Sequence, residues 1–454
     1  MSMEYTIIRP GGNDTCLVFA SVTDVLLRKR INDVIMRAYP NVEQVGFVSG
    51  TPQVPVLTMA GGEFCGNATR SAAAILVNMQ AGKSVSLLVS GVDKPLTAGF
   101  NALGHAYARM PVYADTSRII QVSGQDNTYI VEMEGITHYI ILNSEDTSLI
   151  GDEDIKQQSY EILRRNQLTK FAAAGVMYVY RDESAWRIDP VVYVRDIDTL
   201  FRETACGSGT TALGLVLALR SEKSIINARV IQRSGMPILV SVSYDGNTFQ
   251  DAVISGPVSI VRKGTVIMND RFGYICERIM KPGDVDTLLT TGGLSSLYRN
   301  IFSKAPYFES FTDNEIRGYF LEYATQGLFY VARVENRAIG FGAALPLWRQ
   351  PEVSEILKER GVNLASGWYM ADLGVDNDYR RNGIARTLVM LRMSKMNKGS
   401  TVVMRTSVNN KESQALYGDL GFTPIEGAYQ NVRQMRTDGS TVEDMRLFLA
   451  KQIV

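Results

Sequence analysis

The sequence predicts an α+β fold class: a two-lobed unit, each lobe a sheet wrapped around a central helix, followed by an α/β domain. Two similar segments, residues 63–69 and 204–210, each contain Cys-Gly and predict that the lobes repeat one plan. The strand pattern changes near residue 262, which predicts a separate second domain. We therefore expect a first unit at 1–265, with lobes at about 1–125 and 126–265, and a domain at 270–454.

The first unit consists mainly of short β-branched runs with few helices between them. Each Cys-Gly segment is followed by an apolar run, 71–79 or 211–219, that is long enough for a buried helix. One such helix in each lobe, surrounded by strands, gives the expected architecture. The predicted strands are 5–8, 45–48, 84–89, 138–142, 176–180, 191–194, 228–232 and 238–242.

Composition narrows the class of protein. Lys+Arg and Asp+Glu both number 47, so a nucleic-acid or polyanion binder driven by bulk charge is not expected. Apolar runs are too short to span a bilayer, so we expect a cytoplasmic protein with no membrane partner. Four scattered cysteines do not resemble a disulfide framework, and two histidines exclude a zinc site built from several imidazoles. No metal is expected.

The two Cys-Gly segments predict a pair of reactive thiols. Cys65 and Cys206 should each begin a helix, where unpaired N–H groups lower a thiol pKa and bind anions. Two facing thiols can remove a proton from one face of a carbon and return one to the other face, which is the chemistry of racemisation. For the other two cysteines, Cys16 and Cys276, we expect buried apolar roles.

Four ordered segments resemble the diaminopimelate epimerase fold, which includes PLP-independent amino-acid racemases and epimerases. They are residues 12–14, 65–70, 135–138 and 203–209. The sequence is more similar to histidine racemases than to true diaminopimelate epimerases, because the second Cys segment is compressed and Gly-Ile-Thr-His replaces Gly-Asn-Pro-His. The resemblance implies catalysis by Cys65 and Cys206 without PLP or metal. It also implies substrate binding by Asn13, Gly66, Asn67, His138, Glu203, Gly207 and Ser208.

Some of these residues also have structural interpretations that the sequence leaves open. Asn13 is equally suited to capping a turn, whereas for Asn67 we favour the substrate contact over a role in starting the helix. His138 is equally suited to a packed structural role. Glu63 and Glu203 both flank a cysteine, and we favour Glu203 for binding the substrate ammonium or tuning a thiol.

The second domain contains a basic, glycine-containing loop between a strand and a helix. We expect the strand at 368–375 and the helix at 387–396, so that the loop offers backbone N–H groups to an anion. Upstream we expect a strand at 274–280, helices at 285–302 and 313–324, and a hairpin of 328–334 with 338–344 that turns at 335–337.

This domain resembles the GNAT acetyltransferases through its loop, 380–385, and through residues 410–417 followed by 420–422. The resemblance implies acetyl-CoA as cofactor, with Tyr417 as the acid that protonates the leaving thiolate. Packing alone is the other interpretation of Tyr417. No motif fixes a general base, and Asp372, Glu322 and Glu335 are candidates. The expected cofactor-binding residues are Leu373, Val375, Arg380, Arg381, Asn382, Gly383, Ile384, Ala385 and Asn410.

Together the two units predict a bifunctional enzyme that racemises or epimerises an amino acid and N-acetylates an amine, with the D-amino acid as one possible acceptor. Its partners are then a small amino acid and acetyl-CoA, and a homodimer is the oligomer we consider. The alternative is a related proton-moving isomerase whose GNAT domain senses acetyl-CoA or acetylates an unrelated amine.

Overall fold

The protein is described from a computed structural model, which covers residues 1–182, 185–304 and 307–454. The chain divides into two compact units, Ser2–Lys263 and Gly264–Val454, with Met1 belonging to the second. We call them the first unit and the second unit. The expected α+β class, with an α/β domain following, is confirmed.

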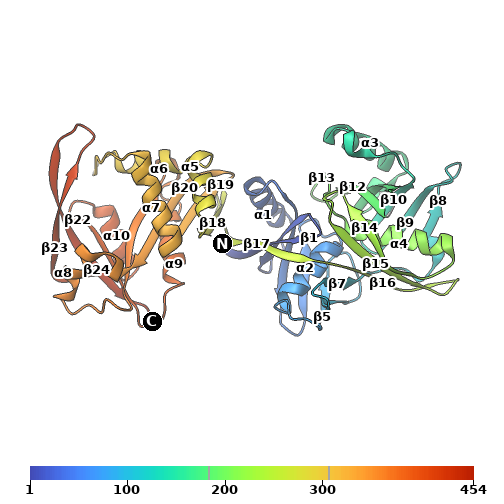
Figure 1. The fold of residues 1–454 in the computed structure, drawn as a ribbon, viewed down its shortest axis with the longest axis horizontal. Coiled ribbons are helices and arrows are strands. Elements are labelled where there is room, and N and C mark those ends of the chain that lie inside the picture. The colour runs from blue at the N-terminus through green and yellow to red at the C-terminus, as the bar shows by residue number, and fades with distance from the viewer. Residues whose placement is uncertain (183–184, 305–306) are drawn as a thin grey trace. The chain divides into compact units, whose positions relative to one another are not determined.

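The first lobe of the first unit surrounds helix α2 (Gly66–Leu76) with strands (Figure 1). Ala72, Ala73 and Ala74 are buried on α2, because small side chains let strands approach the helix closely. A second helix, α1 (Val25–Ala38), is capped by Asp24 and was not expected from the sequence. The strands are β1 (Ser2–Pro10), β2 (Asp14–Phe19), β3 (Val42–Gly50), β4 (Pro55–Met59), β5 (Lys83–Val89), β6 (Leu96–Phe100) and β7 (Ala106–Arg109).

The second lobe repeats this plan around α4 (Gly207–Ser221). Most of α4 is apolar and buried on every side, as a helix enclosed by a sheet must be. Helix α3 (Asp152–Arg165), with acidic residues in its first turn, was also not expected. The strands are β8 (Ile119–Gln121), β9 (Thr128–Met133), β10 (Ile136–Leu142), β11 (Ala173–Arg181), β12 (Trp186–Val194), β13 (Thr199–Arg202), β14 (Ile225–Gln232), β15 (Pro237–Tyr244) and β16 (Phe249–Gly256).

The two lobes join through antiparallel pairing of β7 with β16, and α2 contacts α4. The chain then continues into β17 (Val258–Met268), so the expected change near residue 262 falls inside one continuous strand. A sheet ladder can continue where side-chain pattern weakens, because its hydrogen bonds are made by the backbone.

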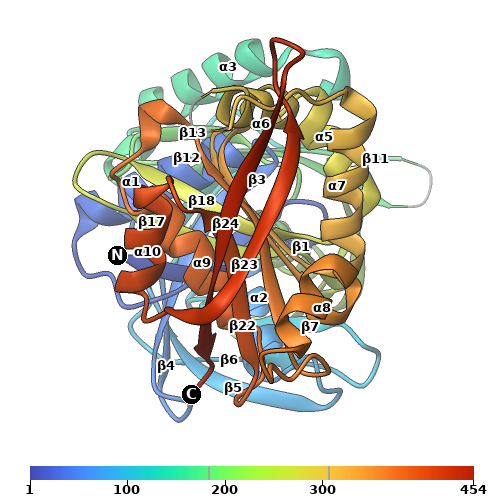
Figure 2. The same ribbon diagram turned by 90° about the vertical axis from the view of Figure 1, so that its left-hand side faces the viewer.

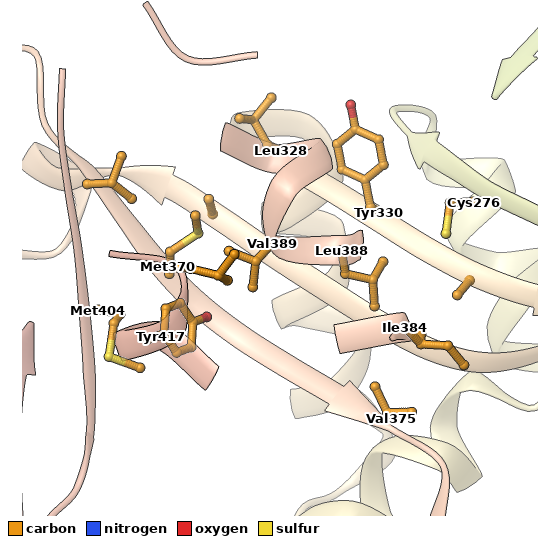
Figure 3. Packing of buried hydrophobic residues seen from close by; sticks show 14 of the residues in the cluster. Cys276, Leu328, Tyr330, Met370, Val375, Ile384, Leu388, Val389, Met404 and Tyr417 are labelled. Carbon is orange, nitrogen blue, oxygen red and sulfur yellow. The ribbon is translucent and has the colours of Figure 1, made fainter. Parts of the chain in front are cut away.

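The second unit is a sheet covered on both faces. Strand β19 (Leu328–Val334) alternates between them: Tyr330 contributes to one core cluster and Phe329 to the other. Figure 3 shows the first cluster, in which Leu388 and Val389 of helix α9 (Ile384–Met393) lie near Tyr330. Helices α5 (Pro282–Thr290), α6 (Leu294–Phe302) and α7 (Asp313–Gln326) supply the second cluster.

One predicted helix of this unit is wrong. Residues 285–302 form two helices, α5 and α6, because Gly293 adopts φ +70° between them and a Cβ at Gly292 would lie 2.9 Å from the Leu288 backbone. The remaining elements include the long β23–β24 hairpin, red in Figure 2. They are β18 (Gly273–Ile279), β20 (Arg337–Pro346), α8 (Pro351–Lys358), β21 (Trp368–Val375), β22 (Thr401–Ser407), α10 (Lys411–Asp419), β23 (Thr423–Met435) and β24 (Thr441–Gln452).

Candidate active sites

Both cysteines occupy the N-cap position of a central helix. Cys65 Sγ accepts a hydrogen bond from Ala68 N at 3.3 Å, and Cys206 Sγ accepts one from Gly209 N at 3.4 Å. In each helix the Thr four residues on donates its hydroxyl to the carbonyl of the Cys at 2.7 Å. The two helix starts therefore have the same local design.

The two helix starts open into one cavity of about 40 Å³ in the first unit. Six of the residues predicted for this site line it: Cys65, Gly66, Glu203, Cys206, Gly207 and Ser208. The lining also includes Glu43, Gln44 and Glu63. Two thiols and three carboxyl groups thus share a small enclosure whose remaining lining is mainly apolar, which suits proton transfer away from bulk water.

Gln44 links the surroundings of the two thiols and was missed by the sequence reasoning. Cys65 Sγ donates to Gln44 Oε1 at 2.9 Å, and Gln44 Nε2 donates to Glu203 Oε1 at 2.6 Å. Cys206 Sγ lies 3.5 Å from Ser208 Oγ, and the Glu203 carboxyl acts on the pKa of both thiols. The only signal in the sequence was the polar pair Glu43-Gln44 inside an apolar strand.

The site favours neutral groups. Burial raises the pKa of both Glu43 and Glu63 to about 7, and burial with the nearby Glu43 charge raises that of Glu203 to about 8. Burial, and then the Glu203 charge, raises the pKa of Cys65 and Cys206 above the usual thiol range. The expectation of depressed thiol pKa values at the helix starts is therefore wrong for this arrangement, because burial outweighs the N–H hydrogen bonds.

Asn13 and Asn67 do not line the cavity. Asn67 Nδ2 donates to Asn13 Oδ1 and to Ala205 O, each at 3.1 Å, so it ties the start of α2 to the residue before Cys206. Arg70 is fully buried, donates from Nε to Asn67 Oδ1 at 3.1 Å, and has a pKa lowered by burial to about 10. These three residues hold the two helix starts together.

His138 also lies outside the cavity lining, buried on β10 beside Gly175. Neither ring nitrogen has a hydrogen-bond partner among the described residues, and burial lowers its pKa to about 3. The ring is therefore neutral at physiological pH. A substrate contact for His138, as for Asn13 and Asn67, stays a prediction.

The basic loop of the second unit leads from β21 into α9. Gly383, with φ +78°, is the N-cap of α9, and Arg381 adopts φ +63°, a conformation that non-glycine residues seldom take. Asn382 Nδ2 donates to Tyr379 O at 3.1 Å and to Arg380 O at 3.0 Å, which fixes the loop. The N–H groups of the first turn, including those of Ile384 and Ala385, lack helical acceptors and can hold phosphate oxygens.

A cavity of about 320 Å³ lies in the second unit and is lined by Leu373 and Tyr417. Val375 is buried in the core, and Asn410 caps α10 while donating from Nδ2 to Tyr307 OH at 2.8 Å. Burial raises the pKa of Tyr417, so its hydroxyl keeps its proton in the resting site.

Of the three candidate bases, Asp372 and Glu322 line this cavity, whereas Glu335 lies at the exposed turn between β19 and β20. Asp372 Oδ2 accepts from Tyr323 OH at 2.9 Å and from Tyr298 OH at 3.2 Å, and burial raises its pKa. The cavity lining also includes two cations that the sequence analysis missed, Arg405 and Arg446.

Residues 2–267 match the family model described as histidine racemase CntK N-terminal domain, which covers more than half of the chain. The chain belongs to this family. Residues 294–422 match the acetyltransferase (GNAT) family. The protein is an enzyme with a racemase unit, the first unit, and an acetyltransferase unit, the second, for which the family implies acetyl-CoA as cofactor.

The curated relatives of the racemase unit are shorter proteins. The histidine racemase of Fusobacterium nucleatum (strain ATCC 23726) is 29% identical over 274 residues, covering 58% of this chain and 97% of that protein. The histidine racemase of Staphylococcus aureus (strain Mu50) is 25% identical over 274 residues, covering 58% and 96%.

Solved structures match each unit at low identity. A hydroxyproline epimerase from Agrobacterium vitis is 12% identical with a TM-score of 0.40, covering 60% of this chain and 94% of that one. The ribosomal-protein-alanine N-acetyltransferase from Brucella melitensis is 18% identical with a TM-score of 0.29, covering 39% and 99%.

Within the described ranges, no helix has the length and apolar character needed to cross a membrane. Across those same residues, no group of three or more His, Cys, Asp or Glu side chains is arranged to hold a metal ion.

Proposed function

We propose that the racemase unit inverts the α-carbon of histidine or a related amino acid with a cationic side chain, using Cys65 and Cys206 as the two proton-transfer groups and no PLP. The observation that carries this proposal is that both thiols line one cavity, where Gln44 joins Cys65 to the Glu203 carboxyl group. Two acid–base groups on facing helix starts supply what inversion requires.

Charge supports the substrate class. Glu43, Glu63 and Glu203 line the cavity with raised pKa values, so a cationic side chain and an ammonium group both find carboxyl groups that can ionise beside them. The N–H groups that follow Cys65 and Cys206 bind the substrate carboxylate and the charge that develops on it. Asn13, Asn67 and His138 keep their predicted role in substrate binding in this proposal.

The proton steps follow from this arrangement. One cysteine, ionised beside the bound cationic substrate although burial alone favours its thiol form, removes the proton from Cα as a thiolate, and the electron pair moves toward the substrate carboxylate. The other cysteine, as thiol, gives its proton to the opposite face of Cα. The two sulfur atoms thereby exchange protonation states, and the reverse direction uses them in the opposite order.

Deuterium exchange tests this mechanism. In D₂O with L-histidine, the wild type should exchange the Cα proton, while Cys65→Ala and Cys206→Ala should each lose roughly 10²–10⁴-fold in racemisation rate. Cys276→Ala, a buried thiol of the other unit, is the matched control. Full racemisation by either single variant would refute the two-thiol mechanism.

For the acetyltransferase unit, we propose that it N-acetylates the D-amino acid made by the racemase unit. Residues 380–385 hold the CoA pyrophosphate, Leu373 and Val375 the pantetheine arm, Asn410 orders the site, and Tyr417 protonates the leaving thiolate. Selective acetylation draws a racemising mixture toward one product. Incubation of L-histidine with acetyl-CoA, followed by chiral chromatography, should give N-acetyl-D-histidine, whereas acetylated L product from Cys65→Ser would contradict the coupling.

A further inference from the structure

The cavity of the acetyltransferase unit contains opposite charges where two strands separate. Strands β21 and β22 pair in parallel only up to Met370 and Met404. Asp372 follows two residues after the last paired position of β21, and Arg405 one residue after that of β22. Both line the cavity, so a carboxyl group and a guanidinium group face the same enclosed space.

Arg405 has capacity for another partner, whereas Arg446 is already neutralised. Arg446 pairs with Glu309 at 3.3 Å and with Asp444 at 3.1 Å. Arg405 donates from Nη1 to the side-chain oxygen of Gln430, and it both hydrogen-bonds the Tyr369 side chain and lies 5.9 Å from the centroid of that ring. Among the described residues it forms no ion pair with a carboxylate, and its buried Nε–H has no acceptor. A guanidinium with a spare buried donor is suited to an incoming carboxylate.

Asp372 is suited to the other end of the same molecule. Its Oδ2 accepts from two tyrosine hydroxyls, which fixes the carboxyl group without supplying a positive charge. Aromatic side chains form much of the remaining lining and offer a surface for an apolar or ring-bearing substituent. They include Tyr298, Phe302, Tyr307, Phe311, Tyr319 and Tyr369.

We propose that Asp372 and Arg405 form a binding site for the two charges of a free α-amino acid, with Arg405 holding its carboxylate and Asp372 its ammonium. This inference rests on the proposed acetyl transfer and names its acceptor class: an amine whose neighbouring carbon bears a free carboxylate. A peptide or protein N-terminus, which carries an amide at that carbon, leaves Arg405 without its anion.

The transfer balances with these groups. The ammonium gives one proton to Asp372, and the freed nitrogen attacks the thioester carbonyl carbon of acetyl-CoA. A C–N bond forms, the C–S bond breaks, and the departing thiolate takes the Tyr417 proton. The second nitrogen proton then returns to Tyr417 through water, so the net products are the N-acetylamino acid, CoA and one proton.

A matched acceptor series tests the inference on the full chain. CoA release is measured with D- and L-histidine, histidinamide and histamine, which share the ring and amine but differ in the carboxylate. The wild type should favour the free acid over the amide and the amine by about 10–100-fold in kcat/KM, the range of a charged hydrogen-bonded contact. Arg405→Met should abolish that preference, Arg405→Lys should keep part of it, and the exposed Arg433→Met should leave it unchanged.

The preference is a ratio within one protein sample, so partial misfolding of a variant does not change it. Equal kcat/KM for acid and amide in the wild type would overturn the inference. In the Cys65→Ser variant, which blocks racemisation, equal use of D- and L-histidine would end the proposed coupling while leaving the Arg405 site intact. If no acceptor is acetylated, titration calorimetry measures the binding of N-acetyl-D-histidine to the CoA-saturated chain. Loss of this binding in Arg405→Met would support the site, and unchanged binding would overturn it.

Discussion

Replacing Glu203 with glutamine should stabilise the racemase unit at alkaline pH while lowering its activity. Burial and the Glu43 charge raise the pKa of Glu203 from 4.5 to about 8, so the folded chain binds this proton more tightly than the unfolded chain. Stability from this group is therefore fully present below pH 4.5 and is lost as the pH rises through about 8.

The magnitude follows from the two pKa values. Between pH 5 and pH 8, ionisation of Glu203 removes about 4 kcal/mol from the free energy of unfolding, at about 1.4 kcal/mol per pKa unit. Glutamine imitates the protonated acid, since its amide oxygen can accept from Gln44 Nε2 as Glu203 Oε1 does. Glu203→Gln should exceed the wild type by about 4 kcal/mol at pH 8 and by under about 1 kcal/mol at pH 5.

Differential scanning calorimetry of the intact chain at pH 5, 6.5 and 8 measures this difference. A gain of that size should raise the racemase-unit transition at pH 8 by several degrees. Glu4→Gln, the same change at an exposed position, is the control and should show no pH-dependent gain. Equal gains at pH 5 and pH 8, or a loss at pH 8, would refute the argument that Glu203 is protonated because it is buried.

Two further substitutions test other parts of the chain. Arg202→Met should cost about 3–5 kcal/mol of racemase-unit stability, because the buried Asp189 loses the guanidinium that lies 2.5 Å away and keeps only the longer 3.9 Å pairing with Arg233. Urea denaturation measures this loss of stability, and a cost under about 1 kcal/mol would contradict the reasoning. In the calorimetry described above, the transition that shifts in this variant is the one that belongs to the racemase unit. Tyr417→Phe keeps the ring against Phe422 but removes the hydroxyl, so kcat for acetyl transfer should fall about 10²-fold with KM for acetyl-CoA unchanged; an unaltered kcat would contradict the acid role.

The sequence predicted the elements whose signals are local. Cys65 and Cys206 were placed at helix starts from the Cys-Gly segments and the apolar runs behind them, and both are N-caps. The strand at 368–375 was predicted with the bounds of β21. The helix at 285–302 failed because its apolar spacing continues across two glycines whose effect is on the backbone rather than on the pattern.

The site residues that were missed depend on contacts between distant segments. Gln44 becomes part of the thiol site only because β3 lies beside Glu203, 159 positions further along the chain. Arg405 lines the second cavity because β21 and β22 separate just before it. Neither position has a local motif. The thiol pKa values were mispredicted for a related reason: a helix start is visible in a sequence, whereas the depth of burial is a property of the whole lobe.

Cys65 and Cys206 occupy equivalent helix starts in unequal surroundings, since Cys65 bonds to Gln44 while Cys206 lies beside Ser208. Mirror-image amino acids have the same free energy in water, so their equilibrium ratio equals one however the two thiols are tuned. The asymmetry can therefore change kcat and KM for each direction, but the ratio kcat/KM must stay equal in the two directions. A surplus of one mirror image has to be drawn from another source of free energy, and on this chain cleavage of the acetyl-CoA thioester is the step able to supply it.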